Sequence, residues 1–272
     1  MNALPERQQA QCGDYRLSWR EAGQGRPVLL LHGISSGSAS WMKQFADAAL
    51  LDGHRLIAWD APGYGDSAAL ANAEPQAADY ANALAALVSH LALRQPLLVG
   101  HSLGALMGSA YGAAYPDGLC GLALADPAQG YASADAEKRR QVLAQRRQMM
   151  DTLGPQGYGE QRAAALLRAD ADPQDIVWVR RGMQQLQPDG FLSAAWMLAN
   201  DDINAYLACY RGPLQVWCGE QDAITPPAAA EALAARQGAP LRLIAAAGHA
   251  SYLDAPACFN RYVRDFTGAI QP

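Results

Sequence analysis

The feature that most constrains this chain is a series of short, nearly continuous apolar runs that each end in a polar residue. These runs are "PVLLLHG" (27–33), "RLIAWD" (55–60), "PLLVGHS" (96–102), "GLALAD" (121–126), "PLQVWCGEQD" (213–222) and "PLRLIAAAGH" (240–249). Strands buried on both faces of a parallel sheet have this character. The earlier segment "YRLSWREAG" (15–23) alternates apolar and polar residues, so we expect it to be an exposed antiparallel strand.

Helix-length amphipathic segments separate the runs, at about residues 75–93, 103–115, 227–237 and 255–268. Strands and helices that alternate in this way predict a doubly wound α/β fold around a mostly parallel sheet. Residues 127–212 depart from this alternation of strands and helices, because they contain several helical segments and are too long for a simple crossover. We therefore expect a core formed by 1–126 and 213–272, and a helical cap formed by 127–212 over the C-terminal edge of the sheet.

Composition and charge exclude several classes of protein. The 272 residues are 50% hydrophobic and 17% charged, which suits a sizeable core and argues against disorder. The formal net charge of −5 does not favour nucleic acid as a partner, since that needs a basic face. The one dense basic stretch, "KRRQVLAQRR" (138–147), has helical spacing and is interpreted as a solvated helix face in preference to a phosphate-binding patch.

The cysteines and the apolar segments bear on location. Five cysteines are scattered without a CxxC pair, which argues against a disulfide framework and against a zinc site. No apolar span approaches the roughly 20 residues that a membrane helix needs. The start, "MNALPERQQAQCG", lacks the apolar centre of a signal peptide. We therefore expect a cytoplasmic protein that does not enter a membrane.

The stretch "LVGHSLGAL" (98–106) contains the candidate nucleophile, Ser102. It has the pattern G-x-S-x-G, with a predicted strand before the serine and a predicted helix after it. Small residues let the chain turn sharply there, which exposes the serine oxygen at the ligand-binding edge of the sheet. The alternative is that Ser102 is only a small residue in a tight turn.

A serine nucleophile needs a base, and His249 is the best placed of the five histidines. It follows Gly248 and the last predicted strand, in a loop at the ligand edge. The alternative is a loop histidine that bonds the backbone. His32 and His101 are interpreted as structural residues, while His54 and His90 are interpreted as surface residues without a catalytic role.

The base needs a carboxylate that fixes its tautomer and stabilises the imidazolium. Asp222 ends a predicted strand and is favoured over Asp126, which ends the neighbouring one. Two backbone N–H groups should form the oxyanion hole. One is that of Leu103, which is free at a helix start, and the other is that of Ile34, in the loop where Gly33 accommodates an unusual dihedral.

Five segments together carry a resemblance to a known family: "LLLHG…W" (29–41), "WDAPGYGDS" (59–67), "GHSLG" (100–104), "CGEQD" (218–222) and "GH" (248–249). In their order and spacing they resemble the α/β-hydrolase superfamily. The resemblance implies the triad Ser102, Asp222 and His249, an oxyanion hole at Ile34 and Leu103, and a helical cap. It also implies no metal and no organic cofactor.

Within that superfamily the chain is similar to enol-lactone hydrolases, small carboxylesterases and hydrolases that cleave C–C bonds in aromatic ring-cleavage products. The C–C hydrolases typically carry Asn before the nucleophile and Trp after the histidine, where this chain has His101 and Ala250. The favoured prediction is therefore a serine hydrolase that cleaves a small ester or lactone through an acyl-enzyme. The alternatives are C–C hydrolysis and a non-catalytic ligand-binding protein of the same fold.

The predicted cap should shape specificity towards a small-molecule carbonyl substrate. Candidate pocket residues are Trp41, Trp178, Met183, Trp196 and Met197, although residues at such spacing also form cores. Arg180 and Arg181 could bind a substrate carboxylate, but solvated arginines are the favoured interpretation. The sequence leaves open whether the chain forms a homodimer.

Overall fold

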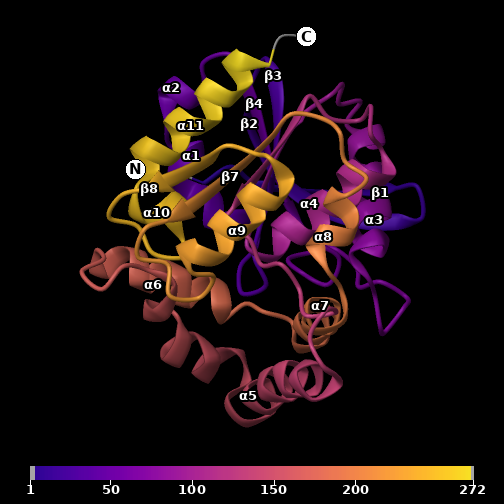
Figure 1. The fold of residues 1–272 in the computed structure, drawn as a ribbon, viewed down its shortest axis with the longest axis vertical. Helices are drawn as coiled ribbons and strands as arrows, with labels where there is room; N and C mark the ends of the chain where they lie inside the picture. The colour runs from indigo at the N-terminus through magenta and orange to yellow at the C-terminus, as the bar shows by residue number, and fades with distance from the viewer. Residues whose placement is uncertain (1–3, 271–272) are drawn as a thin grey trace.

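The structure is a computed structural model that describes residues 4–270, which form an eight-stranded sheet with helices on both faces (Figure 1). The strands are β1 (Arg7–Cys12), β2 (Tyr15–Gly23), β3 (Arg26–Leu31), β4 (His54–Asp60), β5 (Leu97–His101), β6 (Gly121–Ala125), β7 (Leu214–Gly219) and β8 (Leu241–Ile244). They lie in the order β1-β2-β4-β3-β5-β6-β7-β8. Among these eight strands of residues 4–270, the pairs β1–β2 and β2–β4 are antiparallel and the other pairs are parallel.

The doubly wound, mostly parallel sheet confirms the predicted fold class. All six predicted buried runs contain a strand, and the alternating segment is β2, which pairs antiparallel with β4. Strand β1 was not predicted, because its residues "RQQAQC" are mostly polar and lie at the sheet edge. The last run is a strand only to Ile244, so the chain up to His249 forms a loop.

The helices cover the sheet on both faces. They are η1 (Ser38–Trp41), α1 (Met42–Phe45), α2 (Ala48–Leu51), α3 (Ala77–His90), α4 (Leu103–Ala114), α5 (Ala136–Arg162), η2 (Ala164–Leu166), α6 (Pro173–Met183), α7 (Pro188–Asn200), α8 (Ile203–Leu207), α9 (Pro227–Gln237), α10 (Ser251–Asp254) and α11 (Pro256–Ala269). Figure 1 shows α3, α4 and α8 on one side and α1, α2 and α11 on the other. No helix within residues 4–270 has the length and apolar character needed to cross a membrane.

Residues 127–212, called the helical insertion below, connect β6 to β7 and contain α5 to α8. In Figure 1 their longest helices, α5, α6 and α7, gather at the lower end of the molecule, and α5 packs against both α6 and α7. A sharp bend divides α5 at Gly154, whose φ of 59° is left-handed and suits glycine, directly before Pro155.

The parallel strands bring the candidate site together at one edge. Because β5, β6, β7 and β8 are neighbours and run in the same direction, their carboxyl ends lie side by side. Ser102 follows β5, Asp126 follows β6, Asp222 follows β7 and His249 follows β8. This is the edge at which open α/β sheets bind their ligands.

Candidate active site

Ser102 occupies the sharp turn between β5 and α4. Its φ of 52° and ψ of −116° are strained for a residue other than glycine. The turn can be this tight because glycines stand on both sides. A Cβ on Gly100 would lie 2.4 Å from the carbonyl oxygen of Gly104, and one on Gly104 would lie 2.3 Å from that of Leu31. The close approach of α4 to β3 and β5 therefore holds Ser102 in place.

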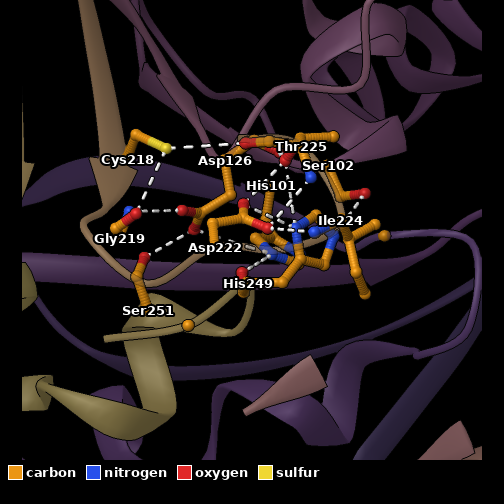
Figure 2. A network of polar contacts seen from close by, with 12 residues as sticks. His101, Ser102, Asp126, Cys218, Gly219, Asp222, Ile224, Thr225, His249 and Ser251 are labelled. Carbon is orange, nitrogen blue, oxygen red and sulfur yellow. Dashed lines mark hydrogen bonds and ion pairs between the residues drawn. The ribbon is translucent and has the colours of Figure 1, made fainter. Parts of the chain in front are cut away.

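The side chains of Ser102, His249 and Asp222 form a hydrogen-bonded chain, although their residues are far apart in sequence (Figure 2). His249 Nε2 lies 3.0 Å from Ser102 Oγ, and His249 Nδ1 lies 2.9 Å from Asp222 Oδ2. All three residues are buried. The carboxylate can only accept at neutral pH, so Nδ1 carries the ring proton and Nε2 accepts from the serine hydroxyl.

The carboxylate of Asp222 is held by four groups. Its Oδ1 accepts from the backbone N–H groups of Ile224 and Thr225, at 2.8 and 2.9 Å. Its Oδ2 accepts from the Thr225 hydroxyl, at 2.7 Å, as well as from His249. Burial alone would raise the pKa of Asp222, but the bonds from His249 and Thr225 outweigh it and the pKa lies below its usual value. Thr225, which the sequence analysis missed, therefore helps to keep Asp222 ionised.

Asp126, the rival acid, bonds other groups. Its Oδ1 accepts from the Gly219 N–H at 2.8 Å, and its Oδ2 lies 2.5 Å from the Ser251 hydroxyl. The Nε2 atom of His101 lies 3.8 Å from Asp126 Oδ2. Burial raises the pKa of Asp126 to about 7. The contact with the base is thus made by Asp222.

Asp126, Cys218 and Asp222 lie close enough together to be considered as metal ligands. Both carboxylates already accept hydrogen bonds from protein donors. The Cys218 thiol lies 3.5 Å from the Gly219 carbonyl oxygen, towards which it donates, and burial raises its pKa. A metal ligand would have to be the thiolate, so this cluster fits a hydrogen-bonded network better than a metal site.

The two backbone N–H groups predicted for the oxyanion hole lie beside Ser102. Ile34 and Leu103 both line the cavity that contains it, and neither N–H donates to another residue within 4–270. The carbonyl oxygen of Gly33 accepts from His32 Nδ1 at 2.8 Å and from the Ser36 N–H at 3.2 Å. Because N–H and C=O point in opposite directions across a peptide, these bonds fix the direction of the Ile34 N–H.

His32 and Gly33 have structural tasks in this loop. His32 Nε2 accepts from the Ala61 N–H at 3.0 Å, so the ring joins two loops. The expectation of an unusual dihedral at Gly33 is wrong, since Gly33 is not among the glycines with positive φ. Glycine avoids crowding there, because a Cβ would lie 3.0 Å from that of Ser102 and 3.1 Å from His101 Nδ1.

His101 lies beside the base. The two rings are 4.9 Å apart, and His101 Nε2 lies 2.8 Å from the backbone carbonyl oxygen of His249, to which it donates. Burial, together with the nearby His249, lowers the pKa of His101 to about 3. His101 is therefore neutral near pH 7 and positions the backbone of the base.

A cavity of about 450 Å³ opens onto Ser102, His249, Ile34 and Leu103. Its remaining lining residues come from the neighbouring loops and the helical insertion, namely Gly33, Ser35, Ser36, His101, Pro127, Ala128, Gln129, Gly130, Tyr131, Arg146, Tyr158, Arg162, Leu166, Leu198, Ile224, Thr225, Pro226 and Ala229. The cavity is large enough for a small substrate and partly polar.

None of the five aromatic and methionine residues predicted for the pocket lines this cavity. Trp41, Met183 and Met197 are fully buried in the hydrophobic core, and Trp196 is half-buried. Trp178 lines a second cavity of about 400 Å³ instead, next to Ser35, Ser36 and Leu166, which line both cavities. Helical spacing alone does not distinguish a face that lines a cavity from a face that packs in the core, and Trp41, Met183 and Met197 belong to the core.

The order of strands and the serine at the β5–α4 turn define an α/β enzyme of the hydrolase class. Residues 26–256 match the family model described as alpha/beta hydrolase fold, and the chain therefore belongs to this family. It is 29% identical over 259 residues to RutD of Variovorax paradoxus, named as a carbamate hydrolase; the match covers 90% of this chain and 93% of the relative.

A second relative matches over a shorter region. It is the 2-hydroxy-6-oxo-6-phenylhexa-2,4-dienoate hydrolase of Comamonas testosteroni, which is 29% identical over 116 residues, 42% of this chain and 41% of the relative.

Two solved structures share the fold over nearly the whole chain. A thermophilic esterase from Thermogutta terrifontis, with malate bound, superposes with a TM-score of 0.86 and 26% identity, covering 98% of this chain and 100% of the esterase. The enol-lactonase from Burkholderia xenovorans gives a TM-score of 0.85 and 21% identity, covering 96% of this chain and 100% of the other. The chain is thus an α/β-hydrolase, and the two relatives named above are hydrolases.

Proposed function

We propose that this enzyme is a serine hydrolase that cleaves a small carboxylic ester or lactone. One observation carries the proposal: Ser102, His249 and Asp222 are joined by hydrogen bonds of 3.0 and 2.9 Å at the wall of a cavity. Hydrolysis by acyl transfer needs a nucleophile, a base and a carboxylate in this arrangement. The esterase among the similar structures and the hydrolase relatives support it.

In the first half of the reaction, Ser102 Oγ attacks the substrate carbonyl carbon while its proton passes to His249 Nε2. The negative charge that develops on the carbonyl oxygen is stabilised by the Ile34 and Leu103 N–H groups. A single donor of this kind is typically worth about 3 kcal/mol in the transition state. The tetrahedral intermediate then breaks its bond to the leaving oxygen, which takes the proton from His249.

In the second half, water attacks the acyl-enzyme and gives a proton to His249 Nε2. The bond between the acyl carbon and Ser102 Oγ breaks, and the proton returns to the serine. The negative charge of Asp222 stabilises the imidazolium in both halves. The acid product then leaves through the cavity, over which we propose that the helical insertion acts as the cap.

A carbamate is the second candidate substrate, because the relative that matches nearly the whole chain is named as a carbamate hydrolase. It presents the same kind of carbonyl carbon to Ser102. A dienoate substrate, cleaved at a C–C bond, is the third, but His101 and Ala250 stand where the resemblance places Asn and Trp in C–C hydrolases.

A substrate panel tests the proposal. The purified enzyme and its Ser102→Ala variant are compared on p-nitrophenyl esters of increasing acyl length, an enol-lactone, an aryl carbamate and a vinylogous dienoate. We expect ester or lactone cleavage that is lost in the variant. Rapid C–C cleavage with negligible esterase activity would replace the substrate assignment, and no turnover of any member would favour a ligand-binding protein.

A further inference from the structure

Two arginines of the helical insertion line the cavity above Ser102. Arg146 lies in the first half of α5 and Arg162 is its last residue, and both are half-buried. Among the residues of 4–270 that line this cavity, none is an aspartate or a glutamate. The wall therefore carries two positive charges without a negative one to balance them.

Three other arginines of the helical insertion have a carboxylate partner, whereas the two that line the cavity have none among the described residues. Arg140 lies 2.8 Å from Glu137, Arg180 lies 3.2 Å from Glu160, and Arg168 lies 3.5 Å from Asp170. Within residues 4–270, neither Arg146 nor Arg162 forms an ion pair.

Arg146 retains donors for a ligand. Its Nη1 donates to the Val142 carbonyl oxygen at 3.0 Å, and a guanidinium has five N–H donors in all. Burial lowers the pKa of Arg146, and the charge of Arg162 lowers it further. A bound anion would oppose both effects, because it stabilises the charged guanidinium.

Polar groups near the arginines connect this wall with the catalytic end of the cavity. Tyr131 and Tyr158 line the same cavity, and the Tyr158 hydroxyl lies 2.8 Å from Ser35 Oγ. Ser35 directly follows Ile34, the proposed oxyanion-hole residue. A ligand held by α5 would therefore lie within the same cavity as the oxyanion hole.

We propose that Arg146 and Arg162 form a subsite for a carboxylate, so that the preferred substrate is a small ester or lactone with a second, negatively charged carboxyl group. A planar guanidinium binds a carboxylate through two parallel hydrogen bonds, which a neutral group of the same shape cannot replace. This inference rests on the proposed serine-hydrolase function, which supplies the scissile bond at Ser102.

Matched esters test the subsite. The monomethyl esters of succinate, glutarate and adipate are compared with analogues in which the free carboxylate is a neutral carboxamide, by measuring methanol release. We expect the wild type to prefer the carboxylate member by at least tenfold in kcat/KM at one chain length, since a hydrogen bond to a charged group is worth about tenfold to a hundredfold. A ratio near one at every length would overturn the proposal.

Variants assign the preference to the two arginines. Arg146→Gln and Arg162→Gln should each lower the carboxylate-to-carboxamide ratio by about tenfold, mainly through KM, and the double variant should abolish the preference. Arg147→Gln is the matched control, because Arg147 is the next residue along α5 and is exposed. A preference that persists in the double variant would place the carboxylate elsewhere and overturn the assignment.

A binding measurement separates this proposal from the catalytic one. Titration calorimetry of the Ser102→Ala variant with succinate, glutarate and adipate needs no turnover. Saturable binding that Arg146→Gln weakens by about tenfold supports the subsite even if no ester is cleaved. Absence of binding, together with equal cleavage of both ester series, overturns the subsite and leaves the serine-hydrolase proposal intact.

Discussion

Replacing Asp222 with asparagine should disable the base while preserving its surroundings. Asp222 Oδ1 accepts from two backbone N–H groups, of Ile224 and Thr225, so the amide oxygen of the introduced asparagine would remain there. The amide NH₂ would then occupy the position of Oδ2, 2.9 Å from His249 Nδ1. Facing a donor, Nδ1 gives up its proton to Nε2, and the ring can no longer accept the proton of Ser102.

The size of the expected loss in kcat follows from the distance between His249 Nδ1 and Asp222 Oδ2. The charges of Asp222 and a protonated His249 ring lie 2.9 Å apart, and with an effective dielectric constant of about 20 they attract by about 6 kcal/mol. Since about 1.4 kcal/mol changes a rate tenfold, loss of this attraction lowers kcat by about 10⁴-fold. The change of tautomer acts in the same direction.

Asp126→Asn is the matched control for this prediction. The asparagine in that variant can still accept from the Gly219 N–H and can donate to the Ser251 hydroxyl, and the native carboxyl already has a pKa of about 7. We expect kcat for a p-nitrophenyl ester within about tenfold of wild type for Asp126→Asn, with both variants folded by circular dichroism. An Asp222→Asn enzyme as active as wild type, or an equal loss in both variants, would refute the assignment.

Two further predictions concern stability. Gly104→Ala should lower the free energy of unfolding by about 1–3 kcal/mol in urea titrations, because the added Cβ would clash with the Leu31 carbonyl. As the control, Gly268→Ala has open space around the added Cβ and should raise the free energy of unfolding by about 0.5–1 kcal/mol. Equal effects of the two substitutions would contradict the packing argument. The pKa of His101 is about 3 in the folded protein and about 6.5 in the unfolded chain. Between these two pH values the unfolded state binds one more proton than the folded state. The free energy of unfolding therefore falls as the pH drops below about 6.5. Between pH 7.5 and 5.0, wild type should therefore lose about 2 kcal/mol more than His101→Gln, and parallel losses would contradict it.

The fold could be predicted from the sequence because strands buried on both faces leave a plain pattern. Five of the six apolar runs form strands that are mostly buried, which fixes the class of the sheet. The sixth contains β8, which lies at the sheet edge and is mostly not buried, with Leu243 exposed. The same pattern placed Ser102, Asp222 and His249 at strand ends, and hence at one edge of the sheet. The choice between Asp222 and Asp126 could only be ranked, because both acids end neighbouring strands.

The walls of the cavity were much harder to predict. Side chains on α5 face solvent, the core or the cavity according to how that helix packs, and the bend at Gly154 changes its direction. The basic stretch 138–147 was interpreted as a solvated face, yet Arg146 from it lines the cavity. Trp41, which was predicted to line the pocket, packs in the core instead. Its ring centroid lies 4.6 Å from that of Tyr252, a residue far away in the chain.

Covalent trapping tests the central claim, that Ser102 is the nucleophile, most directly. The enzyme is treated with a fluorophosphonate, and the site of modification is found by mass spectrometry of its peptides. The proposed mechanism predicts one adduct per chain, on Ser102, with parallel loss of hydrolytic activity, and no adduct in the Ser102→Ala variant. An adduct on another residue, or undiminished labelling of Ser102→Ala, would contradict it.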